Sequence, residues 1–136
     1  MSKYILMFAS VHLPFAFGMR LLLLMLGTPS ASGAGVVAIY VASMVVGSSF
    51  VKSQRRLYTE AERTTLRNGC LVYLLALDSL AVISASRSGV PLSGRALVVI
   101  IALSFLIDLF VLWMAQGFAV RRFMQKQLDR LSVLAK

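Results

Sequence analysis

Four residues that can carry charge lie inside otherwise apolar stretches of this 136-residue sequence: His12, Arg20, Asp78 and Asp108. An ionisable side chain in hydrocarbon costs about 3 kcal/mol or more unless a partner neutralises it. Such residues therefore mark either structural ion pairs or pathways for protons and cations, which carboxylates and histidine carry in transporters. These four residues are the candidate functional network of the sequence.

The depths of the four residues in their segments suggest how they pair. A helical rise of about 1.5 Å per residue places Arg20 and Asp78 about 10 and 12 Å from the same end of the segments. It places His12 and Asp108 deeper, at about 22 and 18 Å. We therefore predict the pairs Arg20–Asp78 and His12–Asp108, or one network of all four. Because an arginine holds a neighbouring carboxylate in its charged form, the pattern favours a structural clamp over a relay.

The elements that position these residues are membrane-spanning helices. The sequence is 59% hydrophobic and only 14% charged, with a mean hydropathy of +0.84, whereas soluble domains are about 45–50% apolar and about 25% charged. Its four apolar runs each approach the ~20 residues that a helix needs to cross a bilayer. Since backbone groups in lipid must be hydrogen-bonded internally, we predict a single all-α domain, 1–136. Its expected form is an integral membrane four-helix bundle with helices at about 4–27, 34–54, 60–86 and 95–120.

Lysine and arginine are distributed unequally between the two ends of this bundle. Two of them, Arg87 and Arg95, fall at one end, and eleven fall at the other. The positive-inside rule then places the N-terminus, the 52–68 loop and the C-terminus in the cytoplasm, and a bacterial inner membrane is the expected location. The predicted cytoplasmic basic surface comprises Lys52, Arg55, Arg56, Arg121 and Arg122. With a net charge of +9, this surface is expected to meet anionic lipid headgroups and no nucleic acid.

Two local patterns describe the segments outside the bilayer. Thr59 followed three residues later by Glu62 has the spacing of a capping box, which predicts that the third helix begins near Glu60. The tail 121–136 is predicted to be an amphipathic basic helix that lies on the cytoplasmic leaflet or docks on a protein partner. Its apolar face comprises Val120, Met124, Leu128, Leu131 and Ala135.

Small residues recur every four positions in the second apolar run: Ala38 with Ala42, and Ser43 with Gly47. Small residues at this spacing allow helices to approach closely, and packing within the bundle is favoured over a dimer face. Cys70 is the single cysteine and His12 the single histidine, which argues against a zinc site. With no nucleophile and base in a recognisable arrangement, we expect neither a catalytic residue nor a metal or cofactor, and hence no enzyme.

The second loop and its flanks carry a resemblance. This stretch contains Phe50-Val51-Lys52, Arg56, Thr59-Glu60-Ala61-Glu62-Arg63, Leu66 and Gly69-Cys70-Leu71. It resembles an uncharacterised family of small four-pass bacterial inner-membrane proteins, and the resemblance implies this topology but no activity. Size, helix number and the basic side also resemble, in shape alone, the immunity proteins that protect bacteria from pore-forming toxins.

These observations lead to an ordered set of functional hypotheses. The first is a protein-binding protein of the inner membrane, most concretely an immunity protein that neutralises a membrane-active toxin. The alternatives are a small ion-coupled transporter or channel that uses Asp78 or Asp108, and an accessory subunit of a larger membrane complex. The order rests on the expected neutralisation of the carboxylates, because ion-coupled transport needs an unpaired one. The oligomeric state stays open.

Overall fold

The chain is all-helical in the computed structural model, which describes residues 1–27, 32–87 and 93–134. The elements are α1 (Ser2–Met25), α2 (Ser32–Gln54), α3 (Glu60–Arg87), α4 (Gly94–Met114), the π-helical turn η1 (Ala115–Ala119) and α5 (Val120–Leu134). The described residues contain no strand. The predicted all-α class is confirmed, and the first three helices begin and end within two residues of their expected bounds.

Four helices are long and apolar enough to cross a membrane: Ser2–Met25, Ala34–Gln54, Glu60–Ser84 and Gly94–Ser132. They correspond to the four apolar runs and agree with a multi-pass membrane protein. In the most apolar 18-residue window of α2, 50% of the residues are buried, against 11% in α1 and 11% in the last span. The helix α2 is therefore the central element around which the others pack.

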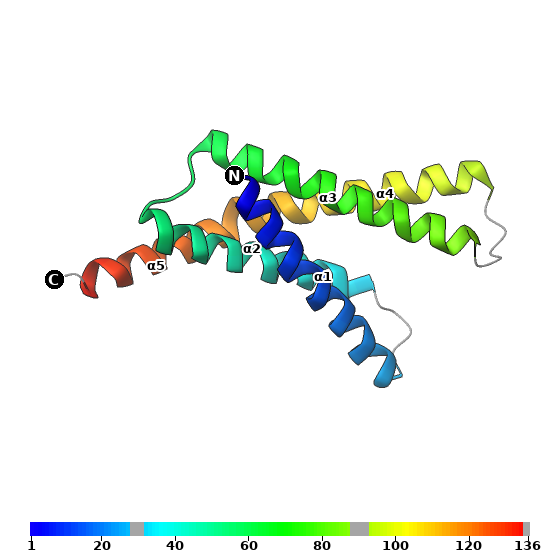
Figure 1. Ribbon diagram of the computed structural model, residues 1–136, viewed down its shortest axis with the longest axis horizontal. Helices are drawn as coiled ribbons and strands as arrows, with labels where there is room; N and C mark the ends of the chain where they lie inside the picture. Colours follow the sequence, from blue (N-terminus) through cyan, green and yellow to red (C-terminus); the bar gives the residue numbers. More distant parts are fainter. Residues whose placement is uncertain (28–31, 88–92, 135–136) are drawn as a thin grey trace.

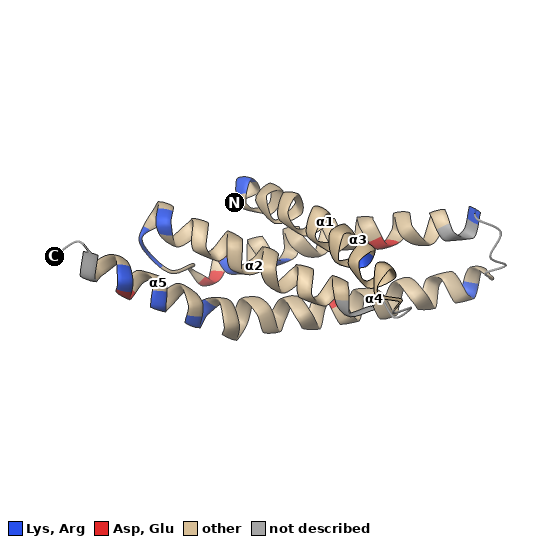
Figure 2. Ribbon diagram, turned by 90° about the horizontal axis from the view of Figure 1, so that it is seen from below, with Lys and Arg blue, Asp and Glu red and all other residues tan. Residues whose placement is uncertain are grey.

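The helices form two antiparallel hairpins, α1 with α2 and α3 with α4, that diverge along the length of the molecule (Figure 1). At one end the hairpins lie together, and here are found the N-terminus, the connection between α2 and α3, and α5. We call this the basic end, because most lysine and arginine residues gather there (Figure 2). At the opposite end the two hairpins separate into two arms.

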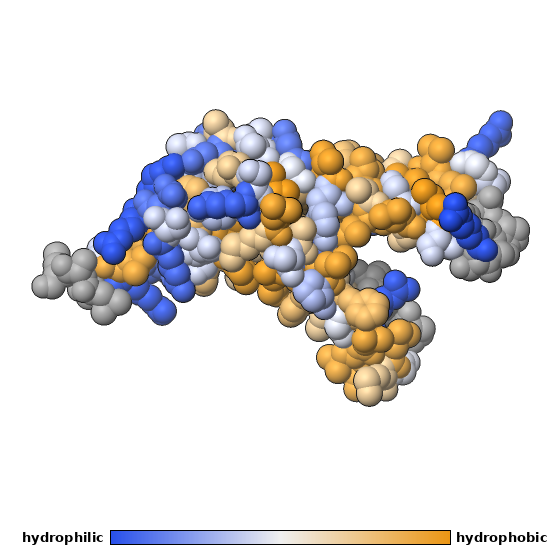
Figure 3. All heavy atoms as spheres, in the orientation of Figure 1, coloured by the Kyte–Doolittle hydropathy of each residue, from blue (hydrophilic) through white to orange (hydrophobic). Residues whose placement is uncertain are grey.

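The buried core is confined to the half of the molecule nearest the basic end. In α1 the last buried residue is His12, in α3 it is Leu74, and in α4 the first is Val111. Among the described residues, the arms beyond these points bury side chains only from α2, such as Ala38 and Ile39. Figure 3 shows hydrophobic side chains covering the surface of the arms and hydrophilic ones covering the basic end. The exposed surface of the arms is thus mainly hydrophobic.

The helix α5 continues α4 through the π turn and packs along α2 (Figure 1). Val120 and Met124 are 2% and 1% exposed, and a Cβ placed on Gly47 would come within 2.7 Å of Val120 Cγ1. The predicted contact of this apolar face with the leaflet is therefore wrong for Val120 and Met124. Because Gly47 has no side chain, α2 approaches α5 closely and covers these two residues. Residues 135 and 136 of the predicted tail lie outside the described residues.

The start of α3 has the predicted capping box. The Thr59 backbone N–H donates to Glu62 Oε2 at 2.9 Å, and the Glu62 backbone N–H donates to Thr59 Oγ1 at 3.3 Å. Arg56 donates two hydrogen bonds of 2.7 Å to the same carboxylate and lies over the ring of Phe50. These contacts fix the connection between α2 and α3 against the core.

Candidate functional site

Asp78 and Asp108 come together where the two hairpins begin to separate. Their carboxyl groups lie within interaction range of each other, and in the sequence each aspartate is the single charged residue of a long stretch of α3 or α4. Asp78 follows the buried Leu74 by four residues, and Asp108 precedes the buried Leu112 by four. Residues four apart share a helix face, so the two aspartates continue the core-facing sides of their helices. Both side chains are half-buried.

The aspartate pair has no cationic partner within the part of the chain that the structure describes. The ion pairs formed there are Arg56–Glu62 and Glu60–Arg63. Asp78 Oδ2 is buried and accepts no hydrogen bond from a described residue. Two carboxyl groups therefore meet within the apolar spans, and one buried carboxyl oxygen has no hydrogen-bond partner among the described residues.

Arg20 does not form the predicted pair with Asp78. Its side chain is exposed, because α1 leaves α3 beyond His12 and carries Arg20 away along the separate arm (Figure 1). The prediction used only the depth of Arg20 and Asp78 along their helices. Depth contains no information about how far the two hairpins diverge. The predicted neutralisation of Asp78 by Arg20 is therefore wrong in this structure.

His12 does not pair with Asp108 either. It is 6% exposed, stacks on Phe8 with ring centroids 5.5 Å apart, and meets the edge of Tyr73. Its Nδ1 lies 3.4 Å from the Tyr73 hydroxyl. The histidine thus belongs to an aromatic cluster between α1 and α3, nearer to the basic end than the aspartate pair.

The small residues of α2 are occupied inside the chain. Ala38 and Ala42 are 0% exposed, Ser43 is 4% exposed, and Gly47 is buried against Val120 and Met124 of α5. These positions allow α1, α4 and α5 to approach α2 closely. They are consequently not open to a separate partner protein.

The five residues of the predicted basic surface, Lys52, Arg55, Arg56, Arg121 and Arg122, are all exposed at the basic end. They differ in their surroundings. Arg56 is held by Glu62, and the hydrogen bond to that carboxylate raises the pKa of Arg56 above its ordinary value. Arg122 lies over the ring of Phe118, whereas Arg121 lines a cavity between α5 and the start of α3. Of the five, Arg121 is the one that shares a cavity with the buried Gln116.

Sequence reasoning missed Gln116, which is the buried polar residue of the π turn. Gln116 is 6% exposed, and neither its Oε1 nor its Nε2 has a hydrogen-bond partner among the described residues. It lies beside the thiol of Cys70, which is fully buried. The signal in the sequence was a single glutamine ahead of the basic tail, and one polar residue does not reveal a π turn.

Neither a search for metal-binding residues nor comparison with known proteins assigns a function to this site. Within the described ranges, no three histidine, cysteine or acidic side chains gather as a metal site. Comparison of the chain with protein-family models, curated proteins and solved structures finds no match. The class that the fold defines is a small all-helical protein with four helices of membrane-spanning length, and the resemblance around residues 50–71 remains a prediction.

Proposed function

We propose that this protein binds a proton or a small cation at the Asp78–Asp108 pair and moves it across a bacterial inner membrane. The observation that supports this function is the meeting of two carboxyl groups, without a cationic partner among the described residues, at the depth of the apolar spans. The hypothesis of a toxin-binding protein ranked first only while Arg20 was expected to neutralise Asp78. Without that ion pair, the main argument against transport no longer applies.

Electrostatics explains why such a pair binds a positive ion. Two negative charges a few ångströms apart repel strongly in a medium of low dielectric, and carboxylates that share a site cannot both stay ionised without compensation. A shared proton or a bound cation removes the repulsion. Asp78 Oδ2, buried and without a hydrogen-bond donor, provides an oxygen ligand of the hard type that such ions prefer.

The position of the pair gives it a route to one side of the membrane. The two aspartates lie beyond Leu74 and Val111, the last buried residues of α3 and α4 toward the end opposite the basic end, and we propose that an ion reaches the pair from that end. We propose that the basic end faces the cytoplasm, because positive residues are retained there. Entry is then from the periplasmic side, and release toward the cytoplasm requires the packed half of the bundle to open.

Reconstitution into liposomes tests the proposed transport. Vesicles that contain the purified protein and an internal pH indicator report proton flux, and internal sodium or potassium indicators report the cations. Asp78→Asn and Asp108→Asn keep the size of the side chains and remove their charge, so we expect either change to reduce the flux at least about tenfold. Asp129→Asn is the matched control, because Asp129 is exposed on α5 and should leave the flux unchanged.

Two results would contradict the transport hypothesis. One is a flux no higher than that of protein-free vesicles for every ion tested, although the protein is folded by circular dichroism and gel filtration. The other is a flux that Asp78→Asn and Asp129→Asn reduce equally.

Fusions with topology reporters test the proposed orientation separately. Reporters fused at Lys136 and within the 55–59 connection should report a cytoplasmic location. A reporter fused at Gly89 should report a periplasmic location. The physical reason is the excess of lysine and arginine at the basic end. A periplasmic signal at Lys136 would reverse the orientation without affecting the transport measurement.

The second candidate function is the binding of a membrane-inserted partner, as an immunity protein binds a pore-forming toxin. The observation that favours it is the separate arm of α1, where Leu21, Leu22 and Leu24 are 48 to 58% exposed. Their surface could accept another apolar helix, whereas the small residues of α2 could not. A partner encoded nearby that co-purifies through detergent and high salt, together with absence of ion flux, would favour this candidate. High salt is needed because a net charge of +9 attracts proteins non-specifically.

A further inference from the structure

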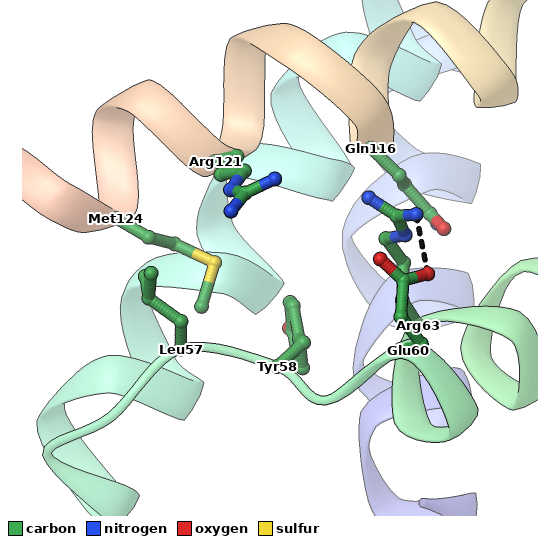
Figure 4. A pocket seen from close by; sticks show the side chains of 7 residues that line it. All are labelled: Leu57, Tyr58, Glu60, Arg63, Gln116, Arg121 and Met124. Carbon is green, nitrogen blue, oxygen red and sulfur yellow. Dashed lines mark hydrogen bonds and ion pairs between the residues drawn. The ribbon is translucent and has the colours of Figure 1, made fainter.

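A cavity at the basic end brings Gln116 together with arginines from two helices. It lies between the 57–63 segment and α5, has a volume of about 100 Å³, and is lined by Tyr58, Glu60, Arg63, Gln116 and Arg121 among others. Figure 4 shows Gln116 reaching from the π turn toward Arg63 and Glu60, with Arg121 on the α5 side. Since a water molecule occupies about 30 Å³, the space accepts a group of a few heavy atoms.

A second hollow of about 120 Å³ adjoins the first, because Arg63 and Gln116 line both. Its other walls are Arg67, Trp113 and Gly117. Trp113 is 61% exposed, and tryptophan is enriched where a membrane protein passes from hydrocarbon to headgroups. The two hollows thus share Arg63 and Gln116 as a common wall, and we call the adjoining pair the recess.

The buried amide of Gln116 has hydrogen-bonding capacity that a ligand would satisfy. Burying an unsatisfied amide is costly, and native proteins rarely leave such a group without a partner. Gln116 is more than nine-tenths buried, and among the described residues its amide has no oxygen or nitrogen partner and only the Cys70 thiol beside it. Its NH₂ group can donate to an acceptor placed in the recess. A π turn is also an irregularity that occurs frequently at functional sites.

The charges around the recess favour an anion. Arg63 is held by Glu60 at 2.6 Å, whereas neither Arg67 nor Arg121 forms an ion pair within the described part of the chain. Two guanidinium groups are therefore available, and guanidinium binds phosphate through paired, charge-assisted hydrogen bonds. Burial raises the pKa of the Tyr58 phenol above its ordinary value, so no competing negative charge arises there.

We infer that this recess binds a phosphate group, carried by the headgroup of an anionic phospholipid. Arg121 binds the phosphate oxygens in the first hollow, the amide of Gln116 donates to one of them, and Arg67 adds positive charge from the adjoining hollow. The acyl chains extend past Trp113 along the apolar surface. The lipid source is favoured over a free phosphate compound because apolar side chains, Trp113 and Met124 among them, line the same recess. This inference is independent of the aspartate pair and of the proposed transport.

The single tryptophan of the sequence makes the inference testable without a label. The full-length protein in a mild detergent is titrated separately with short-chain phosphatidylglycerol, short-chain phosphatidylcholine and inorganic phosphate, and Trp113 emission is recorded. We expect saturable binding of phosphatidylglycerol, and binding at least about tenfold weaker for phosphatidylcholine, whose positive choline group meets the arginines unfavourably.

Variants separate the recess from general surface charge. Arg67→Gln and Arg121→Gln each remove one proposed contact and should weaken the affinity for phosphatidylglycerol about tenfold or more. Arg130→Gln removes the same charge from an exposed position on α5 and should leave the affinity within about twofold. Gln116→Glu keeps the shape of the side chain but places a negative charge against the anion, so binding should be lost while the helical circular dichroism signal is retained.

Three outcomes would overturn the inference in whole or in part. An emission change that does not saturate, or that is equal for the anionic and zwitterionic lipids, would show that no headgroup site exists. Equal losses in Arg67→Gln and Arg130→Gln would assign the binding to general surface charge. Saturation by inorganic phosphate at a comparable concentration, with the same dependence on Arg67, would retain the phosphate site but refute its lipid source.

Discussion

The contact between α2 and α5 at Gly47 can be tested by adding one methyl group. In Gly47→Ala the new Cβ would stand 2.7 Å from Val120 Cγ1 and 3.4 Å from Met124 Cγ. Non-bonded carbons prefer separations of about 3.5–4.0 Å, so the helices must move apart by roughly 1 Å. Val120 cannot easily turn aside, because a β-branched side chain in a helix is held in one rotamer.

The expected change in stability follows from two opposing effects. Overpacking a tight contact costs about 1–3 kcal/mol, while replacing glycine by alanine inside a helix gains about 0.5–1 kcal/mol. Gly47→Ala should therefore lower the free energy of unfolding by up to about 2 kcal/mol. Gly35 is the matched control in the same helix, since a Cβ there would meet no atom within 4 Å, and Gly35→Ala should be neutral or stabilising.

The assay is reversible unfolding in mixed micelles of increasing sodium dodecyl sulfate content, followed by circular dichroism. Val120→Ala removes the methyl group that Gly47→Ala would strike, so the double variant should lose less stability than the sum of the two single changes. If Gly47→Ala is as stable as Gly35→Ala, then α5 does not pack on α2 at this position. The placement of the basic tail against α2 would then be refuted.

Three further predictions concern the polar and reactive residues. A double-mutant cycle should give a coupling near zero for Arg20 with Asp78 and at least about 0.5 kcal/mol for Asp78 with Asp108; the opposite order would restore the cross-helix ion pair. Thr59→Ala removes the cap of α3 and should lower the free energy of unfolding by about 1 kcal/mol, measured in the same micelles, and no loss would argue against the capping box. Cys70, at 0% exposure, should react with a maleimide far more slowly in the native protein than after unfolding, and equal rates would place it at the surface.

The sequence contained most of the information needed for the helices, because their signals are local. Apolar runs of membrane-spanning length placed the first three helices closely, and the Thr59–Glu62 spacing located the start of α3. The fourth helix was expected to continue past residue 120 into a helical tail, and the structure joins the two through the π turn Ala115–Ala119. No residue pattern in the sequence marked the π turn, in which Ala115 and Gln116 are buried.

The arrangement of the functional residues was less predictable, because it depends on how the hairpins diverge. The four polar positions inside the apolar runs were identified correctly as unusual, and a depth along each helix could be assigned to them. Depth alone suggested that Arg20 pairs with Asp78, whereas in the structure Asp108 lies next to Asp78. His12 lies next to the aromatic ring of Tyr73. Angular position around each helix and the tilt between hairpins decide these contacts, and neither can be read from a single sequence.

The packing of α5 on α2 also affects how the chain is completed during synthesis. The residues that cover Gly47 come from Val120 and Met124, which leave the ribosome long after α2 has been inserted. Until then, a newly inserted chain displays the small-residue face of α2 with its final neighbour missing. A chain that ends before Val120 therefore keeps α1 and α4 as neighbours of its central helix but lacks the side chains that cover Gly47.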